Sequence, residues 1–351
     1  MMSKKNVSTL KVAATYIGTV VGAGFATGQE ILQFFSRFGK MGLLGLVIAT
    51  ILFMLFGYII MDMGRKLHAS SHLEIINHAG GRTLGKIIDI LITFFLFSSF
   101  TAMIAGTGAL LTQQFNLPGS LGNILMAVLT AFTVLTGING VINSISFVVP
   151  FLLAAVIGTG IFSLISSPPM LETPLYIVPN NLVLNWFTAT VLYVSYNTIL
   201  SVSVLGPLGS KASSPNSLRN GAILGGLGLG LGAAMIYLSL AGNITQVMNL
   251  EVPMIFIAGN ISLFVKSAYS IVLIAEIYTT AVGSLFGFTA RVACSKNNPL
   301  KNKLVVAATT VTALLLSQFG FSNIVKYMYP VEGYGGMILL ICLLIFFIKN
   351  K

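Results

Sequence analysis

Long apolar runs, separated by short polar or charged stretches, form the dominant pattern along this chain. A membrane-spanning helix needs about 20 mainly apolar residues, and the pattern predicts ten such spans. The predicted spans are 11–36, 41–61, three spans within 90–171, and then 182–208, 222–241, 267–290, 304–319 and 335–348. The 82-residue stretch 90–171 carries no charge, and turn-forming residues at 116–119 and 137–140 divide it. A further apolar segment, 252–264, is too short to span and predicts a re-entrant or surface helix.

The composition supports a membrane location. Of the 351 residues, 19 are Lys or Arg and 8 are Asp or Glu, which is 8% charged against 56% hydrophobic. A soluble domain is about 25% charged, so the lipid bilayer is the expected surrounding of a single polytopic domain, 1–351. The sequence shows no basic segment with interleaved aromatic residues, so we expect no nucleic-acid partner. The sequence does not indicate an oligomeric state.

The positive charges predict the orientation. With the N-terminus inside, 15 of the 19 Lys and Arg residues fall on the inner side, and Arg37, Lys40, Lys266 and Lys326 on the outer side. This bias follows the positive-inside rule and places both termini in the cytoplasm of a cell-membrane protein. Five spans precede the Pro-rich stretch 166–181 and five follow it, so the second half is inverted relative to the first, as in many secondary transporters. The repeats would be about 8–166 and 182–349, inferred from the span count alone.

The first span is rich in glycine. Four glycines fall within 18–28, and each costs a helix about 1 kcal/mol relative to Ala. We predict a helix break between Val21 and Gly28, near the middle of the bilayer. Backbone N–H groups freed there would favour binding of a carboxylate, and the carbonyls that end the preceding half-helix would favour binding of a cation. The alternative is a close-packing face made by Gly18, Gly22 and Ala26.

A resemblance accompanies this motif. The run 18–30, GTVVGAGFATGQE, and the entry to the last span, 329–336, resemble the amino acid–polyamine–organocation superfamily of LeuT-type fold, and within it the YkvI-like bacterial membrane proteins. The resemblance implies an all-α protein with ten spans, helices 1 and 6 broken, and a 5+5 inverted repeat. It implies substrate binding at the backbone of Gly22, Ala23, Gly24 and Phe25. It also implies a sodium site that uses carbonyls of Gly18 and Val21 and two adjacent hydroxyls of the eighth span.

The eighth span contains the matching side chains. Glu276, Thr279 and Thr280 follow the i, i+3, i+4 spacing of one helix face. A carboxylate at this depth is by default functional, so Na⁺ or H⁺ could be the coupling ion. A protonated Glu276 in a structural hydrogen bond is the alternative. Proton-driven members of the superfamily often carry a lysine in the fifth span in place of the sodium ion. The fifth span of this chain, 139–165, has neither Lys nor Arg, so that solution is absent here.

The sixth span carries a polar stretch near its middle. Tyr193, Ser195, Tyr196 and Asn197 could form one wall of a substrate site or hydrogen-bond neighbouring helices. No glycine occurs in this span before Gly206, so the sequence does not locate the break that the resemblance implies. His68, His72 and His78 lie in an inner loop, which we interpret as solvated.

These features predict a secondary active transporter of a small organic solute, either amino-acid-like or an amine, coupled to Na⁺ or H⁺. A passive facilitator or channel is the alternative. No histidine or metal cluster is predicted within the spans, so we expect neither enzymatic activity nor a cofactor beyond the coupling ion.

Overall fold

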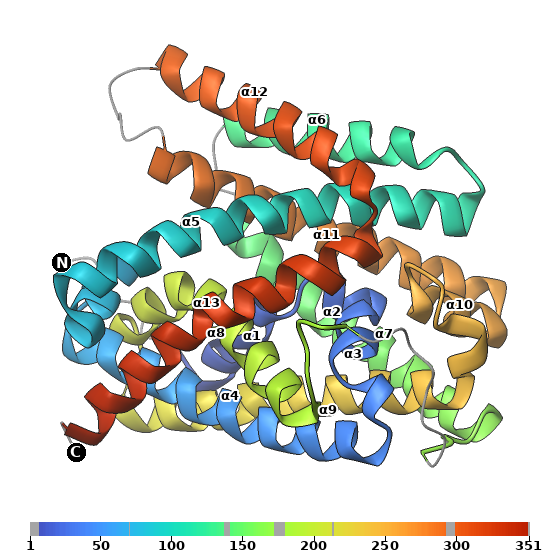
Figure 1. Ribbon diagram of the computed structural model, residues 1–351, viewed down its shortest axis with the longest axis horizontal. Coiled ribbons are helices and arrows are strands. Elements are labelled where there is room, and N and C mark those ends of the chain that lie inside the picture. Colours follow the sequence, from blue (N-terminus) through green and yellow to red (C-terminus); the bar gives the residue numbers. More distant parts are fainter. Residues whose placement is uncertain are drawn as a thin grey trace.

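The computed structural model describes residues 7–69, 71–136, 141–171, 180–212, 214–292 and 299–349. Within these ranges the regular elements are helices, and one isolated bridge pairs Val7 with Ala212 (Figure 1). The α-helices are α1 (Thr9–Val20), α2 (Ala23–Thr27), α3 (Gln29–Phe34), α4 (Lys40–Lys66), α5 (His72–Phe115), α6 (Gly119–Thr136), α7 (Val141–Ser166), α8 (Trp186–Ser210), α9 (Pro215–Val247), α10 (Pro253–Ile261), α11 (Leu263–Val292), α12 (Pro299–Leu316) and α13 (Phe321–Lys349). Two short 3₁₀ helices, η1 (Ser36–Phe38) and η2 (Ser317–Phe319), complete the order.

The described residues include eight helical segments long and apolar enough to cross a membrane. They lie in α4, α5, α7, α8, α9, α11, α12 with η2, and α13, while α6 is a shorter apolar helix. The segment expected to be too short to span is α10, a nine-residue helix. The predicted linker at 137–140 and half of the Pro-rich stretch 166–181 fall outside the described residues.

The predicted interruption of the first span is confirmed. Helix α1 ends at Val20, and the chain is extended at Val21 (φ −70°, ψ 127°) and Gly22 (φ −140°, ψ −170°). Helix α2 then runs for five residues. Gly28 follows in a left-handed conformation (φ 86°) and is both the C-cap of α2 and the N-cap of α3. Because a residue with a side chain rarely adopts such a positive φ, Gly28 permits a second change of direction within the same span.

The predicted break in the sixth span is not present. Helix α8 runs continuously from Trp186 to Ser210, and the Asn185 side chain caps its start by accepting from Thr188 N at 2.8 Å. The absence of glycine before Gly206 is the physical reason, because nothing in this stretch favours unwinding. The polar side chains bond within the helix instead, as where Asn197 Nδ2 donates to Tyr193 O (3.0 Å).

Helices α5 and α13, like α9, extend further than the apolar runs predicted. Helix α5 begins at His72, with a capping box formed by Ser71 and Glu74 and a non-helical residue at Gly81. Helix α13 begins at Phe321, well before the predicted start at residue 335, and includes Pro330. Charged and turn-forming residues ended the predicted spans, but they do not end the helices in which they lie.

The short helices of the first span lie in the interior. Helix α2 contacts α5, α10 and α11, and α3 contacts α8, α9 and α13. Helices α6 and α12 pack side by side along one edge of the molecule (Figure 1), away from α2 and α3. The interrupted backbone of the first span is therefore surrounded by protein, the setting in which unpaired backbone groups are tolerated at membrane depth.

Candidate functional site

The break between α1 and α2 lies against α11. A Cβ built at Gly22 would be 3.8 Å from Cγ2 of Thr280, in ordinary van der Waals contact. One turn further along α2, the hydroxyl of Tyr269 in α11 donates to the carbonyl of Ala26 (2.6 Å). Helix α11 therefore holds α2 in place and brings Thr280, one of the two predicted hydroxyl residues, to the break.

The first backbone amides of α2 have no helical partner. The first intrahelical bond of this helix is from Ala26 N to Gly22 O, at 3.0 Å, so the N–H groups of Ala23, Gly24 and Phe25 precede the hydrogen-bonded turn. These are the amides predicted to bind the substrate. The N–H of Phe25 already has an acceptor, the carboxylate of Glu30.

Glu30 lies in α3 and folds back over Gly24. It is 3% exposed, and a Cβ at Gly24 would lie within 3.0 Å of three Glu30 atoms. The carboxylate also lies beside the hydroxyl of Tyr196. Glu30 Oε2 and the Tyr196 hydroxyl nonetheless have no hydrogen-bond partner among the described residues, so the two groups are close without being aligned.

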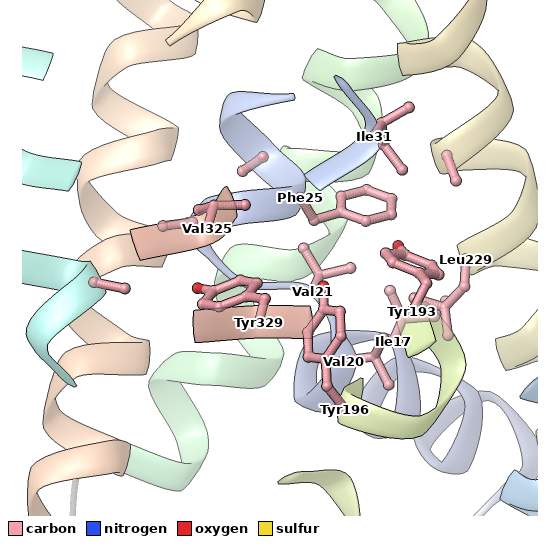
Figure 2. Close-up of a cluster of buried hydrophobic side chains, with 14 of the residues drawn as sticks. Ile17, Val20, Val21, Phe25, Ile31, Tyr193, Tyr196, Leu229, Val325 and Tyr329 are labelled. Carbon is pink, nitrogen blue, oxygen red and sulfur yellow. The ribbon is translucent and has the colours of Figure 1, made fainter. Parts of the chain in front are cut away.

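Aromatic rings from α3, α8 and α13 cluster beside this carboxylate. The ring of Tyr196 lies 5.7 Å from that of Tyr193, 5.0 Å from that of Tyr329 and 5.7 Å from that of Phe34. Figure 2 shows the three tyrosines next to Val21 and Phe25, at the point where the first span is interrupted. We call Phe34, Tyr193, Tyr196 and Tyr329 the aromatic cluster.

A second buried carboxylate approaches from α13. Glu332 is 0% exposed and lies beside the hydroxyl of Ser98 in α5, close enough to Glu30 for the two charges to interact. Neither Glu332 oxygen nor Ser98 Oγ has an aligned hydrogen-bond partner among the described residues. A buried polar group without a partner costs free energy, so these oxygens require a ligand, a proton or a rearrangement.

A third carboxylate belongs to the eighth-span set. Glu276 is 1% exposed, and the hydroxyl of Thr280 lies beside it, although both Glu276 oxygens lack an aligned partner in the described structure. Thr279 differs from the expectation in one respect, since its hydroxyl donates to the carbonyl of Glu276 (3.0 Å). Gly18 is buried within α1 and Val21 is the C-cap of that helix. The predicted carbonyl ligands therefore come from the end of α1, and the predicted hydroxyl ligands come from α11.

The sixth-span residues divide into two groups. Tyr193 and Tyr196 are buried in the aromatic cluster beside the break. Ser195 instead donates to the carbonyls of Leu192 (3.1 Å) and of Gly333 in α13. The hydroxyl of Ser195 and the side-chain amide of Asn197 are therefore already engaged with backbone, whereas the Tyr196 hydroxyl is not.

Sequence patterns do not single out Glu332 or Ser98, and they include Glu30 only as the last residue of the run 18–30. A carboxylate in a chain with eight acidic residues is a signal in itself when it lies in a span. Pro330 and Gly333 predict a turn before the last span and so place Glu332 outside it, whereas α13 includes all three residues.

The interpretation of His72 as solvated is wrong. It is 8% exposed, its Nε2 lies 2.8 Å from Oδ1 of Asp89, and Arg291 of α11 contacts both. His68 has a positive φ of 51° and lies outside the helix that begins at His72. Among the described residues, no group of three or more His, Cys, Asp or Glu side chains could hold a metal ion.

Two relatives match almost the whole chain. Membrane protein YkvI of Bacillus subtilis (strain 168) is 31% identical over 336 residues, covering 95% of this chain and 94% of YkvI. The chain belongs to the YkvI family of membrane proteins. Protein YyaD of the same organism is 30% identical over 339 residues, covering 95% of this chain and 96% of YyaD. No family model matches.

Solved structures show that this chain has the LeuT fold. MhsT, solved in complex with L-phenylalanine, superposes with a TM-score of 0.66 at 18% identity, covering 95% of this chain and 88% of MhsT. A manganese transporter of Eremococcus coleocola gives a TM-score of 0.61 at 14% identity, covering 96% and 78%. A Na⁺-coupled sialic acid symporter gives 0.60 at 11% identity, covering 89% and 72%. At these identities the likeness concerns the fold.

Proposed function

We propose that this protein is a secondary active transporter that moves a small organic solute, amino-acid-like or an amine, across the cell membrane. The observation that carries the proposal is the interrupted first span, where Gly22 lies against Thr280 and Gly24 lies against the buried carboxylate of Glu30. Discontinuous helices at membrane depth typically form the solute and ion sites of secondary transporters. The fold is shared with MhsT, which was solved with L-phenylalanine, with a manganese transporter and with a Na⁺-coupled sialic acid symporter.

The proposed architecture has ten spans in two inverted repeats of five. Eight apolar helical segments, the shorter α6 and the divided first span together support this count. The repeats would cover about 8–166 and 182–349, with both termini in the cytoplasm. The placement of 15 of the 19 basic residues on the inner side supports this orientation.

The solute and the ion would occupy neighbouring places. We assign the solute to the backbone of Gly22, Ala23, Gly24 and Phe25 with Tyr193, Ser195, Tyr196 and Asn197. We assign the coupling cation to Gly18, Val21, Glu276, Thr279 and Thr280. Carbonyl, hydroxyl and carboxylate oxygens are the ligands that a hard cation such as Na⁺ prefers, while a proton would need Glu276 alone.

A screen followed by gradient-driven uptake tests this function. Purified protein is screened by thermal shift with amino acids and amines, each in NaCl or KCl, because a ligand of the native state raises its apparent stability. A solute that binds is then offered to proteoliposomes with an inward Na⁺ gradient, an inward H⁺ gradient or neither, with empty liposomes as the control. Accumulation above the external concentration under either gradient is the expected result. Uptake that only equilibrates and ignores both gradients would contradict active transport and identify a facilitator.

A further inference from the structure

We propose that Glu30 and Glu332, with the aromatic cluster, form a recognition site for the protonated amino group of the transported solute, which makes that solute an amine without a required carboxylate. The inference rests on the proposed transport function and specifies its substrate class.

Two buried carboxylates face this site without a positive partner. Glu30 and Glu332 are 3% and 0% exposed, and among the described residues neither pairs with a Lys, Arg or His side chain. Glu30 Oε2 and both Glu332 oxygens lack hydrogen-bond partners there. The two residues flank one aromatic contact, because Tyr196 beside Glu30 packs 5.0 Å from Tyr329, which precedes Glu332 by three residues in α13. Two ionised carboxylates this deeply buried and within range of each other's charge are unfavourable unless a cation or a proton joins them. The site is therefore electrostatically complementary to a positive charge.

The surrounding groups favour an organic cation over a metal ion. The ring of Tyr196 has three aromatic neighbours with centroids 5.0–5.7 Å away, and aromatic faces attract ammonium groups that lie within about 6 Å. Among the described residues, no group of three or more His, Cys, Asp or Glu side chains could hold a metal ion. An ammonium needs only the few acceptors that these residues leave open.

The position of Glu30 explains why the solute needs no carboxylate of its own. The N–H of Phe25, one of the amides expected to bind a solute carboxylate, instead donates to Glu30. A second carboxylate at this point would be repelled by Glu30 and would compete for the same donor. The chain thus contributes the negative group that an amino acid would otherwise bring, and the solute contributes the positive one.

Matched ligands test this assignment. Thermal shift and equilibrium binding in fixed NaCl compare butylamine, putrescine and phenethylamine with the neutral butanol and 2-phenylethanol and with the zwitterions 4-aminobutanoate and L-phenylalanine. The expected order is amine above zwitterion, with no binding by the neutral compounds. Equal binding of amines and neutral compounds, or stronger binding of the zwitterions, would overturn the inference.

Variants locate the site. Glu30→Gln and Glu332→Gln should each weaken amine binding at least tenfold, and Tyr196→Phe should weaken it less because the ring remains. Glu251→Gln serves as the matched control, since Glu251 caps α13 at Ser322 N (3.3 Å) outside the site. If a glutamine variant fails to fold, Ser98→Ala and Tyr196→Phe, which each remove a single oxygen, must still lower the affinity. Wild-type affinity in the folded carboxylate variants, or in both single-oxygen variants, would reject the site.

The experiments distinguish a wrong amine site from a wrong transport function, because each gives a different result. Gradient-driven uptake of a zwitterion with no amine binding would reject the amine site and leave the transporter in place. Amine binding that depends on both carboxylates, without gradient-driven uptake, would reject active transport and retain the site. Loss of proton-driven uptake in Glu30→Gln with unchanged amine affinity would show that the pair carries a proton, and would overturn the inference.

Discussion

The carboxylate of Glu30 lies directly against the Cα of Gly24, so that a Cβ at residue 24 would come within 3.0 Å of three Glu30 atoms. The two residues lie on either side of the left-handed turn at Gly28. Gly24 is therefore required by a close approach within the site, in addition to the helix break that the sequence predicts. The packing alternative for the glycine run applied to Gly18, Gly22 and Ala26, and it does not account for this contact.

Substitution of Gly24 should displace the Glu30 side chain. We expect Gly24→Ala to lower solute affinity about tenfold and Gly24→Leu to abolish transport, with both proteins still monodisperse in detergent. Binding and uptake by purified protein measure the effect. Gly158→Ala is the control, because a Cβ there meets no atom within 4 Å and Ala favours a helix by about 1 kcal/mol. Loss of expression with Gly24→Ala would instead indicate that the glycine serves packing.

The two predicted wall residues of α8 should respond differently. The Tyr196 hydroxyl has no hydrogen-bond partner among the described residues, whereas Asn197 Nδ2 donates to Tyr193 O at 3.0 Å within the helix. We expect Tyr196→Ala to weaken solute binding more than tenfold and Asn197→Ala to weaken it less than threefold. Equilibrium binding by the two purified variants tests this. Equal affinity in both variants would assign Tyr196 to packing between helices.

The break was predictable because it depends on local chemistry. Glycines at 22 and 24 disfavour a helix whatever surrounds them, and the i, i+3, i+4 spacing places Glu276, Thr279 and Thr280 on one face. The approach of Glu30 to Phe25 depends instead on the left-handed turn at Gly28 between α2 and α3, and that of Glu332 to Ser98 depends on how α13 meets α5. The second contact joins residues far apart in the chain, so no pattern within one segment contains it.

The continuous α8 illustrates the same limit in the opposite direction. The resemblance implies a broken sixth helix, but this chain offers no glycine before Gly206, and the helix remains intact. The extent of α13 was also hidden, because Pro330 is usually a turn signal yet lies inside the helix. Local residue chemistry was the better guide in α8, and tertiary packing decided α13.

An ion pair between Asp89 and Arg291 should join α5 to α11. Arg291 Nε lies 3.4 Å from Asp89 Oδ1, and His72 contacts both residues. Because Asp89 is about one-third exposed, we expect Asp89→Asn to destabilise the protein by only about 1 kcal/mol. A double-mutant cycle with Arg291→Gln, followed by thermal unfolding in detergent, measures the coupling. Strictly additive effects would mean that the pair contributes nothing to stability.

The stability contribution of Glu251 should decrease as the pH rises. Burial raises the pKa of this carboxyl group, although the N–H groups of Ser322 and Phe321 oppose the shift. The folded protein thus holds the proton more tightly than the unfolded chain, and the stabilisation present below the unfolded pKa is lost as the pH rises through the folded pKa. Glu251→Gln mimics the protonated form, so its Tm relative to the wild type should increase between pH 4 and pH 8. A constant difference would contradict this environment for Glu251.

Two substitutions on α11 distinguish Na⁺ from H⁺ as the coupling ion. Thr280 faces the break at Gly22, and its hydroxyl lies beside Glu276, so a bound Na⁺ would use both residues while a proton would need only the carboxylate. We favour sodium, because carbonyls and hydroxyls supply additional hard ligands. Thr280→Ala should then raise the Na⁺ concentration needed for half-maximal uptake about tenfold, while a pH gradient alone drives little uptake.

The proton alternative makes the opposite prediction. If Glu276 carries a proton, Glu276→Gln should uncouple uptake from the pH gradient, and replacing Na⁺ by K⁺ should change nothing. Thr289→Ala is the control on the same helix, because its hydroxyl, like that of Thr279, bonds to a backbone carbonyl three residues earlier. Uptake in proteoliposomes under imposed Na⁺ and H⁺ gradients distinguishes the two. Indifference of the wild type to both gradients would leave α11 without a coupling ion and the protein as a facilitator.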